Sequence, residues 1–431
     1  MPGGIPYIVG NEAAERFSFY GMRAILAVFM TKHLIDAVGK PDVMSEAEAT
    51  FWMHEFVFAV YLTPILGGLL ADIFFGKYRT IIVLSIVYCL GHLALAIDST
   101  RWGLGLGLAL IALGAGGIKP CVSAHVGDQF GKTNQHLLAR VFGWFYFAIN
   151  LGAATSMLLT PWLLQRLGAH VAFAVPGVLM LIATIVFWMG RYKFIHIPPG
   201  GIRFVRETFS PEGIRAILKL SVLYLFVLMF WSLFDQTSSR WVFQAQSMNR
   251  DVFGWEVLPS QMQAANPFLV MILIPLFSYV IYPQVGKVIR LAPLRKVAFG
   301  MAFAVAAFAL TAWLEQRIQD GESPTIAWQF LAYILITSAE VMISITCLEF
   351  SYTQAPKAMK SFIMSLFLAS IALGNQFTAV VNLVIMNPDG TSKLEGASYY
   401  WFFTGAMLVT TILFLPVVFF YRYQTYIHDD A

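Results

Sequence analysis

Long apolar runs alternate with short polar connections along the whole chain. A run of about 20 apolar residues is long enough to cross a bilayer as a helix. Because lipid offers the backbone no hydrogen bonds, helices are the expected structure of such runs. Twelve runs of this kind can be counted, approximately 13–34, 50–75, 79–98, 102–125, 138–165, 169–190, 219–246, 264–285, 294–315, 325–352, 359–386 and 397–421. The pattern predicts an all-α integral membrane protein with twelve transmembrane helices.

The longest connection between runs is the segment 192–218, which is basic and contains Pro-Pro-Gly-Gly. It separates six runs in residues 1–191 from six runs in residues 219–431. A plan of six plus six helices favours two bundles arranged around a central path. We therefore predict an N-terminal six-helix bundle, a cytoplasmic linker and a C-terminal six-helix bundle.

Composition supports the membrane assignment. Hydrophobic residues make up 58% of the chain and charged residues only 12%, whereas a soluble domain has about 25% charged residues. The three cysteines lie in apolar runs without CxxC spacing, so we expect small core residues and no disulfide or metal framework. Lipid is an expected partner, and nucleic acid, metals and organic cofactors are not.

Lys and Arg are distributed unevenly between the two sets of connections. The connections after the second, fourth, sixth, eighth and tenth runs, with the C-terminal tail, hold more than twice as many as the other set. Connections rich in Lys and Arg lie on the cytoplasmic side. Because the number of runs is even, both termini are predicted to be cytoplasmic.

The apolar runs also contain ionisable residues: Glu12, Glu15, Arg16, Arg23, His54, Glu55, Lys119, Asp235, Arg240, Glu340 and Glu349. A charge at mid-bilayer costs at least about 2.5–3.5 kcal/mol on insertion scales, so such residues face an internal cavity and pair with one another. The glycine-rich run 103–117 resembles a phosphate loop but follows no strand. It indicates close packing of helices instead.

The first run carries its charges on one helical face. Glu12, Arg16, Phe19 and Arg23 recur at steps of three or four residues. Glu12 and Arg16 can pair directly at this spacing. Arg23 has no acid within one turn, so its partner must come from another helix or from an anionic ligand. Asp235 and Arg240, five residues apart, are expected to serve different partners.

The two halves offer charges of opposite sign, with Arg16, Arg23 and Lys119 in the first and Asp235 and Glu340 in the second. A cavity with both signs suits a zwitterion, whose carboxylate is held by Arg or Lys and whose ammonium is held by Glu. The residues expected to add neutral contacts are Tyr61, Asn150, Trp231 and Asn266. Burial disfavours a charged carboxyl group, so the acids expected to bind and release protons near neutral pH are Glu12, Glu15 and Asp235; His54 can do the same.

Six segments resemble signature segments of the proton-dependent oligopeptide transporters, a branch of the major facilitator superfamily. They are NEAAERFSFYGMRA, GGLLADIFFGKYRT, GAGGIKPCVSAHVGDQF, FYFAINLGAATS, FWSLFDQTSSRW and AEVMISITCLEFSYTQAPKAMKS. The first resembles the ExxERF signature of the family. The matches occur in order along nearly the whole chain, and they imply the major facilitator fold and a proton-coupled symporter of di- and tripeptides in the plasma (inner) membrane, functional as a monomer.

The resemblance also implies roles for individual residues. Glu12, Glu15 and Arg16 would form the proton-coupling set, joined by His54, while Arg23 and Lys119 would face the carboxylate of the peptide. Glu340, with Asn150 and Asn266, would hold the peptide amino group. Lys119 would also be able to pair with Glu340. Asp235 would be a gating acid that pairs with Arg23. The chain departs from many relatives in having Phe19-Tyr20 where they have Tyr-Tyr, and Ala27 where some have a tyrosine.

Three alternative functions compete with this interpretation. A transporter of the same superfamily for nitrate, an amino acid derivative or a drug is the nearest one, although Lys119 with Glu340 favours a zwitterion. A membrane enzyme is disfavoured because Ser123, His125 and Asp128 do not share a helix face and no HExxH motif is present. A channel is disfavoured because paired opposite charges suit a gated cavity better than a continuous pore.

Overall fold

The computed structural model describes residues 1–130, 138–196, 198–199, 201, 206, 210–289, 291–354, 360–387 and 392–420. The chain forms two compact units, Met1–Phe204 and Val205–Ala431. The predicted bundle boundaries, 1–191 and 219–431 with a linker at 192–218, stay a prediction.

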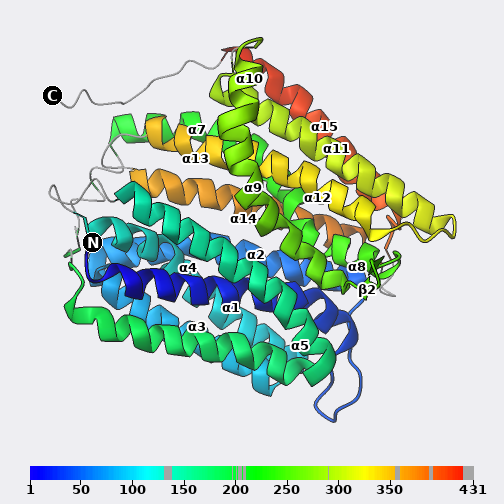
Figure 1. Ribbon diagram of the computed structural model, residues 1–431, viewed down its shortest axis with the longest axis horizontal. Coiled ribbons are helices and arrows are strands. Elements are labelled where there is room, and N and C mark those ends of the chain that lie inside the picture. Colours follow the sequence, from blue (N-terminus) through cyan, green and yellow to red (C-terminus); the bar gives the residue numbers. More distant parts are fainter. Residues whose placement is uncertain are drawn as a thin grey trace. The chain divides into compact units, whose positions relative to one another are not determined.

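Unit 1 consists of helices that lie side by side (Figure 1). Its elements are α1 (Ile5–Lys32), α2 (Glu46–Leu69), the π-helical segment η1 (Leu70–Phe75), α3 (Lys77–Ile97), α4 (Arg101–Asp128), α5 (Leu138–Met189) and the short 3₁₀ turn η3 (Gly190–Tyr192). Helix α1 packs along α5, α3 packs against α4 and α5, and α2 packs against α4.

Helix α1 differs from its predicted bounds, whereas α5 breaks between two predicted runs. Helix α1 begins at Ile5 rather than at residue 13, with Pro6 in its first turn, where a missing backbone N–H leaves no hydrogen bond unmade. Helix α5 is two helices joined at Gly168, whose φ of 85° is non-helical. Glycine adopts this left-handed conformation without steric cost. The break lies between the two runs predicted at 138–165 and 169–190.

The glycines of the run 103–117 bring α4 close to its neighbours. A Cβ atom on Gly114 would lie 2.6 Å from Cβ of Tyr88, and one on Gly107 would lie 2.6 Å from Cγ of Leu95. On another side of α4, a Cβ on Gly67 of α2 would lie 2.4 Å from Cα of Gly117. These contacts confirm that the glycines serve close helix packing.

One end of unit 1 is held by polar contacts between the ends of helices. Lys77 at the start of α3 pairs with Asp128 at the end of α4, with Nζ and Oδ2 2.7 Å apart. Gln129 binds the backbone of Ile195 on both sides, accepting from its N–H at 2.9 Å and donating to its carbonyl oxygen at 3.3 Å. The segment that follows α5 is therefore anchored to the end of α4.

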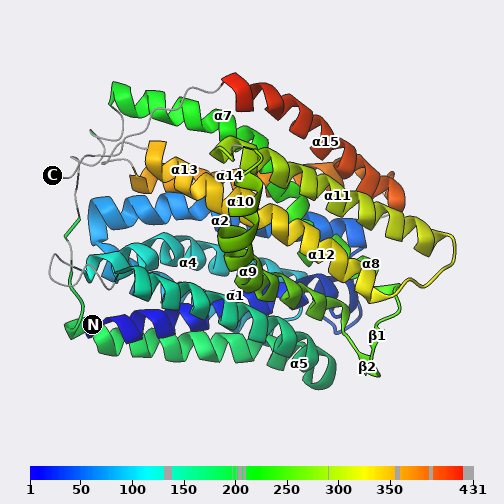
Figure 2. The ribbon, with the colours of Figure 1, turned by 45° about the horizontal axis from the view of Figure 1, so that its top comes forward.

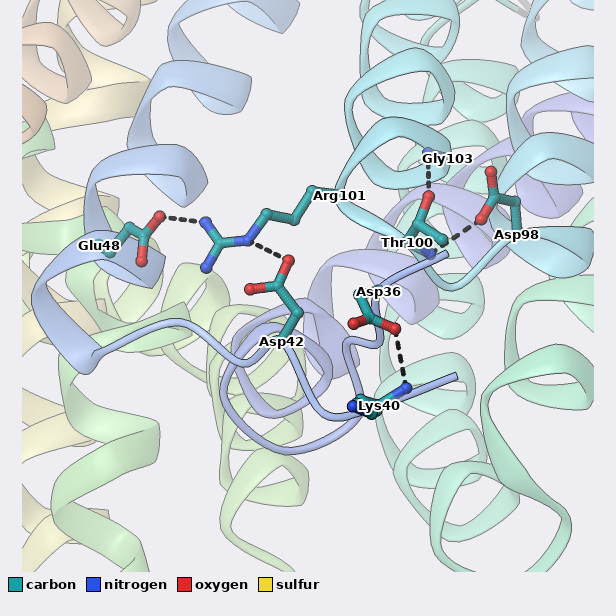
Figure 3. A network of polar contacts seen from close by, with 8 residues as sticks. All are labelled: Asp36, Lys40, Asp42, Glu48, Asp98, Thr100, Arg101 and Gly103. Atoms are coloured by element: carbon teal, nitrogen blue, oxygen red, sulfur yellow. Dashed lines mark hydrogen bonds and ion pairs between the residues drawn. The ribbon is translucent and has the colours of Figure 1, made fainter. Parts of the chain in front are cut away.

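At the opposite end, Arg101 ties the connection between α1 and α2 to the start of α4 (Figure 3). Its Nε lies 2.9 Å from Oδ2 of Asp42, and its Nη1 contacts Glu48 in the first turn of α2. Within the connection, Asp36 accepts a hydrogen bond from the backbone N–H of Lys40 at 2.9 Å. A single guanidinium thus joins three segments of unit 1.

Unit 2 is also helical, with a short hairpin. Its elements are α7 (Pro211–Phe234), the 3₁₀ turn η4 (Asp235–Ser238), α8 (Arg240–Gln246), β1 (Asp251–Val252), β2 (Trp255–Glu256), the 3₁₀ segment η5 (Pro259–Ala264), α9 (Ala265–Leu276), the π-helical segment η6 (Phe277–Ile281), α10 (Tyr282–Gly286), α11 (Pro293–Gln319), α12 (Ile326–Glu340), the π-helical segment η7 (Val341–Ile345), α13 (Thr346–Gln354), α14 (Lys360–Ile385) and α15 (Ala397–Phe420). Helix α7 begins at Pro211 rather than at residue 219, because proline fits the first helical turn.

Helix α11 packs between α15 and α12, and α14 packs against α7. Figure 2 shows α11 beside α15 and α12. The strands β1 and β2 are antiparallel, with Asp251 opposite Glu256 and Val252 opposite Trp255. This hairpin was not predicted from the hydrophobic pattern, which contains no alternating segment long enough to indicate it.

Within the described residues, ten helical stretches are long and apolar enough to cross a membrane. One of them, Phe147–Tyr192, contains the break at Gly168, and the charged helix α1 is not among the ten. The predicted all-α class is confirmed, and the chain is a multi-pass membrane protein. The number of twelve spanning helices stays a prediction.

Candidate functional site

The charged residues at the start of α1 form one ion cluster. Nε of Arg16 lies 2.7 Å from Oε1 of Glu12 and 3.2 Å from Oε2 of Glu15. Both carboxyl groups are buried, and the Arg16 side chain is only 11% exposed. The i,i+4 pair predicted from the spacing is confirmed. A single guanidinium faces both carboxylates, which offsets part of the cost of burying them in a membrane helix.

Lys119 of α4 lies next to this cluster, enclosed by aromatic rings. Its Nζ is 3.9 Å from the centroid of the Phe19 ring on α1 and 4.5 Å from that of the Tyr61 ring on α2. The charges of Glu12, Glu15, Arg16 and Arg23 all act on this ammonium group. Although Pro120 follows Lys119, α4 runs through it as one continuous helix.

Three further predicted residues of unit 1 are placed around this region by their helices. Arg23 is buried on α1, two turns beyond Arg16, and His54 is buried on α2, two turns before Tyr61. Asn150 is buried on α5, the helix that packs along α1. Ala27, where some relatives have a tyrosine, is fully buried.

In unit 2, Glu340 is held by an amide. Nδ2 of Asn266 on α9 donates to Oε2 of Glu340 at 2.6 Å and lies 3.2 Å from Oγ1 of Thr337. Glu340 is the last residue of α12 and directly precedes the π-helical segment η7. Asn266 and Glu340, expected to hold the peptide amino group together, are thus in direct contact, and their role at the amino group stays a prediction. The side chain of Glu349, the other acid of this run, lies outside the described residues.

Asp235 is likewise held by an amide. It opens the 3₁₀ turn η4, and its Oδ2 accepts from Nδ2 of Asn375 on α14 at 2.6 Å. The charge of Asp235 also acts on Glu340, so the two acids of unit 2 lie within electrostatic range of each other. Trp231, one turn earlier, is buried and meets the ring of Phe234 edge-on at a centroid distance of 5.5 Å.

Arg240 has a different set of neighbours from Asp235, as the spacing predicted. Its Nη2 donates to Oδ1 of Asn382 at 2.8 Å, and its guanidinium lies 4.2 Å from the centroid of the Tyr399 ring. Nδ2 of Asn382 in turn lies 3.0 Å from the Tyr399 hydroxyl. Asn382 and Tyr399 thus contact a buried cation.

Sequence reasoning missed several residues that organise these acids and cations, namely Phe19 as a partner of Lys119, Thr337, Asn375, Asn382 and Tyr399. A signal was available for two of them, because Asn375 and Asn382 occur seven residues apart in an apolar run and so lie on one helix face. The pairs expected from the resemblance, Arg23 with Asp235 and Lys119 with Glu340, join residues of different units and stay predictions.

The geometry gives no support for a metal site or for the enzyme alternative among the described residues. Among the described residues, no group of three or more His, Cys, Asp or Glu side chains is arranged to hold a metal ion. Asp128, considered above with Ser123 and His125, pairs with Lys77. The side chain of Ser123 lies outside the described residues.

The chain is similar to peptide transporters in sequence and in structure. It is 36% identical over 368 residues to "Peptide transporter family 1" of Drosophila melanogaster, covering 74% of this chain and 48% of that protein. It matches the crystal structure of an auto-inhibited POT family peptide transporter with a TM-score of 0.89 and 36% identity over 99% of both chains. A second crystal structure, of a proton dependent oligopeptide (POT) family transporter, matches with a TM-score of 0.81 and 37% identity over 95% of this chain and 100% of that one.

The chain spans about half the length of the curated relatives it matches. The sequence profile of the POT family matches residues 78–210 and 202–402, which is most of the chain. The match extends over both units and includes Lys119, Asp235, Asn266 and Glu340. The chain therefore belongs to the POT family.

Proposed function

We propose that the protein is a proton-coupled symporter that imports di- and tripeptides by alternating access. The observation that carries the proposal is that this member of the POT family contains two kinds of charged site. One is the buried Glu12–Arg16–Glu15 cluster beside Lys119, and the other is the Asn266–Glu340 pair. The names of the relatives, which are peptide transporters, support the same substrate class.

The substrate roles follow from charge. Arg23 and Lys119 supply positive charge for the carboxylate of the peptide, and Glu340 supplies negative charge for its amino group. Neutral contacts come from Tyr61, Asn150, Trp231 and Asn266. Because these groups read only the two termini and the backbone, side chains of many kinds are accepted. Peptides of two or three residues are proposed as substrates because of the resemblance to the oligopeptide transporters.

The proton-coupling role belongs to Glu12, Glu15 and Arg16, with Asp235 and His54 as further proton carriers. Protonation of Glu12 or Glu15 removes one of the two negative charges that face Arg16, so the guanidinium gains freedom to change partner. A zwitterionic dipeptide has no net charge, so each proton that accompanies it carries one positive charge inward. That charge supplies about 2.3 kcal/mol per 100 mV of membrane potential.

The proposed location is the plasma (inner) membrane, with lipid around the helices and both termini in the cytoplasm, as the Lys and Arg distribution predicts. The functional unit is proposed to be a monomer. The transported proton is the only coupling species, and no cofactor takes part.

The proposal is tested by uptake of a radiolabelled dipeptide into proteoliposomes that contain the purified protein. We expect accumulation above the external concentration when the lumen is alkaline or negative, and only equilibration without a gradient. Unlabelled di- and tripeptides should compete, whereas nitrate and free amino acids should not. Competition by nitrate or by an amino acid derivative, without competition by peptides, would favour the other solute class and contradict the proposal.

A further inference from the structure

The ammonium group of Lys119 lies against two aromatic rings that come from two different helices. Phe19 belongs to α1 and Tyr61 to α2, and their centroids are 3.9 Å and 4.5 Å from Nζ. Both distances are within the range of about 6 Å over which a ring face attracts a cation. The attraction arises because the face of an aromatic ring carries partial negative charge.

The rings are held in place by their own packing. Phe19 is fully buried, and it meets Tyr20 edge-on at 5.3 Å and Phe56 in a tilted arrangement at 6.2 Å. Such contacts restrict the rotation of the ring. The face that Phe19 presents to Lys119 is therefore set by the packing of α1 on α2.

The backbone around Lys119 is built for close approach to α2. Gly116 and Gly117 directly precede the Ile118–Lys119 pair. A Cβ on Gly117's neighbour in α2, Gly67, would lie 2.4 Å from Cα of Gly117, and Thr63 donates across to the carbonyl oxygen of Ala112 at 2.9 Å. These contacts fix the position of α4 relative to Tyr61.

A ring face differs from a carboxylate in what it does to the cation. The acids Glu12 and Glu15 attract Lys119, and the cations Arg16 and Arg23 repel it. Phe19 and Tyr61 act on the ammonium group through their ring faces and add no net charge of their own.

We propose that Phe19, acting with Tyr61, is a positioning residue that holds the Lys119 ammonium group in place for the carboxylate of the substrate, and so sets the preference for peptides with a free C-terminus. This rests on the proposed function. It also assigns a role to Phe19, at the position where many relatives of the chain have tyrosine: a phenylalanine acts on the ammonium group only through its ring face.

The test measures uptake and competition with two ligands, a dipeptide and the same dipeptide with an amidated C-terminus. In Phe19→Leu the ring is removed and the side chain stays apolar. We expect the KM for the dipeptide to rise about tenfold, as the loss of a desolvated cation–π contact predicts, and the inhibition constant of the amide to change little. The ratio of the inhibition constant of the amide to the KM of the dipeptide should therefore fall about tenfold. Phe19→Tyr keeps a ring face and should restore the ratio.

A matched control separates positioning from packing. Phe29 lies on the same helix, is fully buried, and meets Phe173 edge-on at 4.9 Å. Phe29→Leu removes a buried ring of the same size and should affect both ligands equally. If Phe19→Leu fails to fold, Phe19→Met provides a second ring-free side chain of similar volume.

The outcomes are distinguishable. If the unaltered protein does not take up the dipeptide, the proposed function is wrong. If it does so with a preference for the free carboxylate, and Phe19→Leu or Phe19→Met keeps that preference, the positioning role of Phe19 is wrong. A loss of preference in the ring-free variants, with retention in Phe19→Tyr and Phe29→Leu, supports it.

Discussion

Glu12 and Glu15, proposed for proton coupling, are held differently from Lys119 and Glu340, proposed for substrate binding. In unit 1, Glu12 and Glu15 face a common cation, Arg16. Lys119 lies against two rings, and in unit 2 Glu340 accepts from an amide. When a carboxylate that faces a cation is protonated, the cation loses the negative charge that attracted it. A ring or an amide carries no net charge, so it leaves the charge of the group that it contacts available to a ligand of opposite charge.

The helices that carry these groups differ as well. In unit 1 the charged residues lie in continuous α-helix, and α4 runs unbroken through Pro120. In unit 2, Asp235 opens a 3₁₀ turn and Glu340 precedes a π-helical segment. Such distortions are frequent at functional sites because they re-aim side chains and expose backbone groups. In unit 1 the charged side chains are thus positioned by close packing of regular helices, and in unit 2 they are positioned by distortions of the helices that carry them.

The largest expected effect comes from Glu15→Gln, which removes one charge from the ion cluster. At 100 mV one proton per peptide sustains about a fiftyfold accumulation. The variant should lose this accumulation, because the amide cannot carry a proton, and should retain exchange of peptide across the membrane. Proteoliposome uptake with an imposed gradient measures the first, and counterflow measures the second.

The matched control is Glu322→Gln. Glu322 is half-exposed and pairs with Arg317, with Oε2 and Nη2 2.7 Å apart. The Glu322→Gln variant should therefore accumulate the peptide as strongly as the unaltered protein. Concentrative uptake by Glu15→Gln would show that this acid is not needed for coupling, and the contrast between ion-paired and amide-held groups would lose its functional meaning.

Glu340→Gln should have the next largest effect. The glutamine side chain can still accept from Asn266, so the fold is kept, but the negative charge for the amino group is lost. Hydrogen bonds to charged groups are worth about 1.5–3 kcal/mol, which corresponds to a rise in KM of roughly ten- to a hundredfold. An N-acetylated dipeptide, which has no ammonium group, should be nearly insensitive to the change.

Glu315→Gln provides the comparison within unit 2, because Gln244 donates to Oε2 of Glu315 at 2.8 Å. It changes another acid held by an amide but outside the proposed site. Both peptides should be unaffected by it. An equal loss of the free and acetylated peptides in Glu340→Gln would point to a structural role of this acid and would overturn its assignment to the amino group.

The smallest effect concerns the close packing of unit 1. In Gly114→Ala the new Cβ would lie 2.6 Å from Cβ of Tyr88 and 2.8 Å from the carbonyl oxygen of Leu84. Overpacking of this kind costs about 1–3 kcal/mol, so thermal unfolding in detergent should occur at a lower temperature. Gly105→Ala on the same helix meets no atom within 4 Å and should leave the unfolding temperature unchanged or raise it. Equal stability of the two variants would mean that α3 and α4 are not held by glycine contacts.

The sequence by itself determined the helices and the local ion pair. Apolar runs of spanning length must be helical because lipid leaves the backbone no other partners, and Glu12 pairs with Arg16 because residues four apart lie on one face of a helix. The glycine run predicted close packing on the same ground. Each of these follows from the spacing of residues along a single helix, so no knowledge of tertiary structure was needed.

Tertiary structure alone decided the partners that lie far apart in the chain. Asn266 and Glu340 are separated by 74 positions, and Asp235 and Asn375 by 140. The position of Phe19 against Lys119 likewise depends on how α1, α2 and α4 pack. Helix distortion at Asp235 and after Glu340 rotates the following residues away from their ideal phase. Such proximities depend on the packing of several helices at once, and the spacing of residues on any one of them does not contain that information.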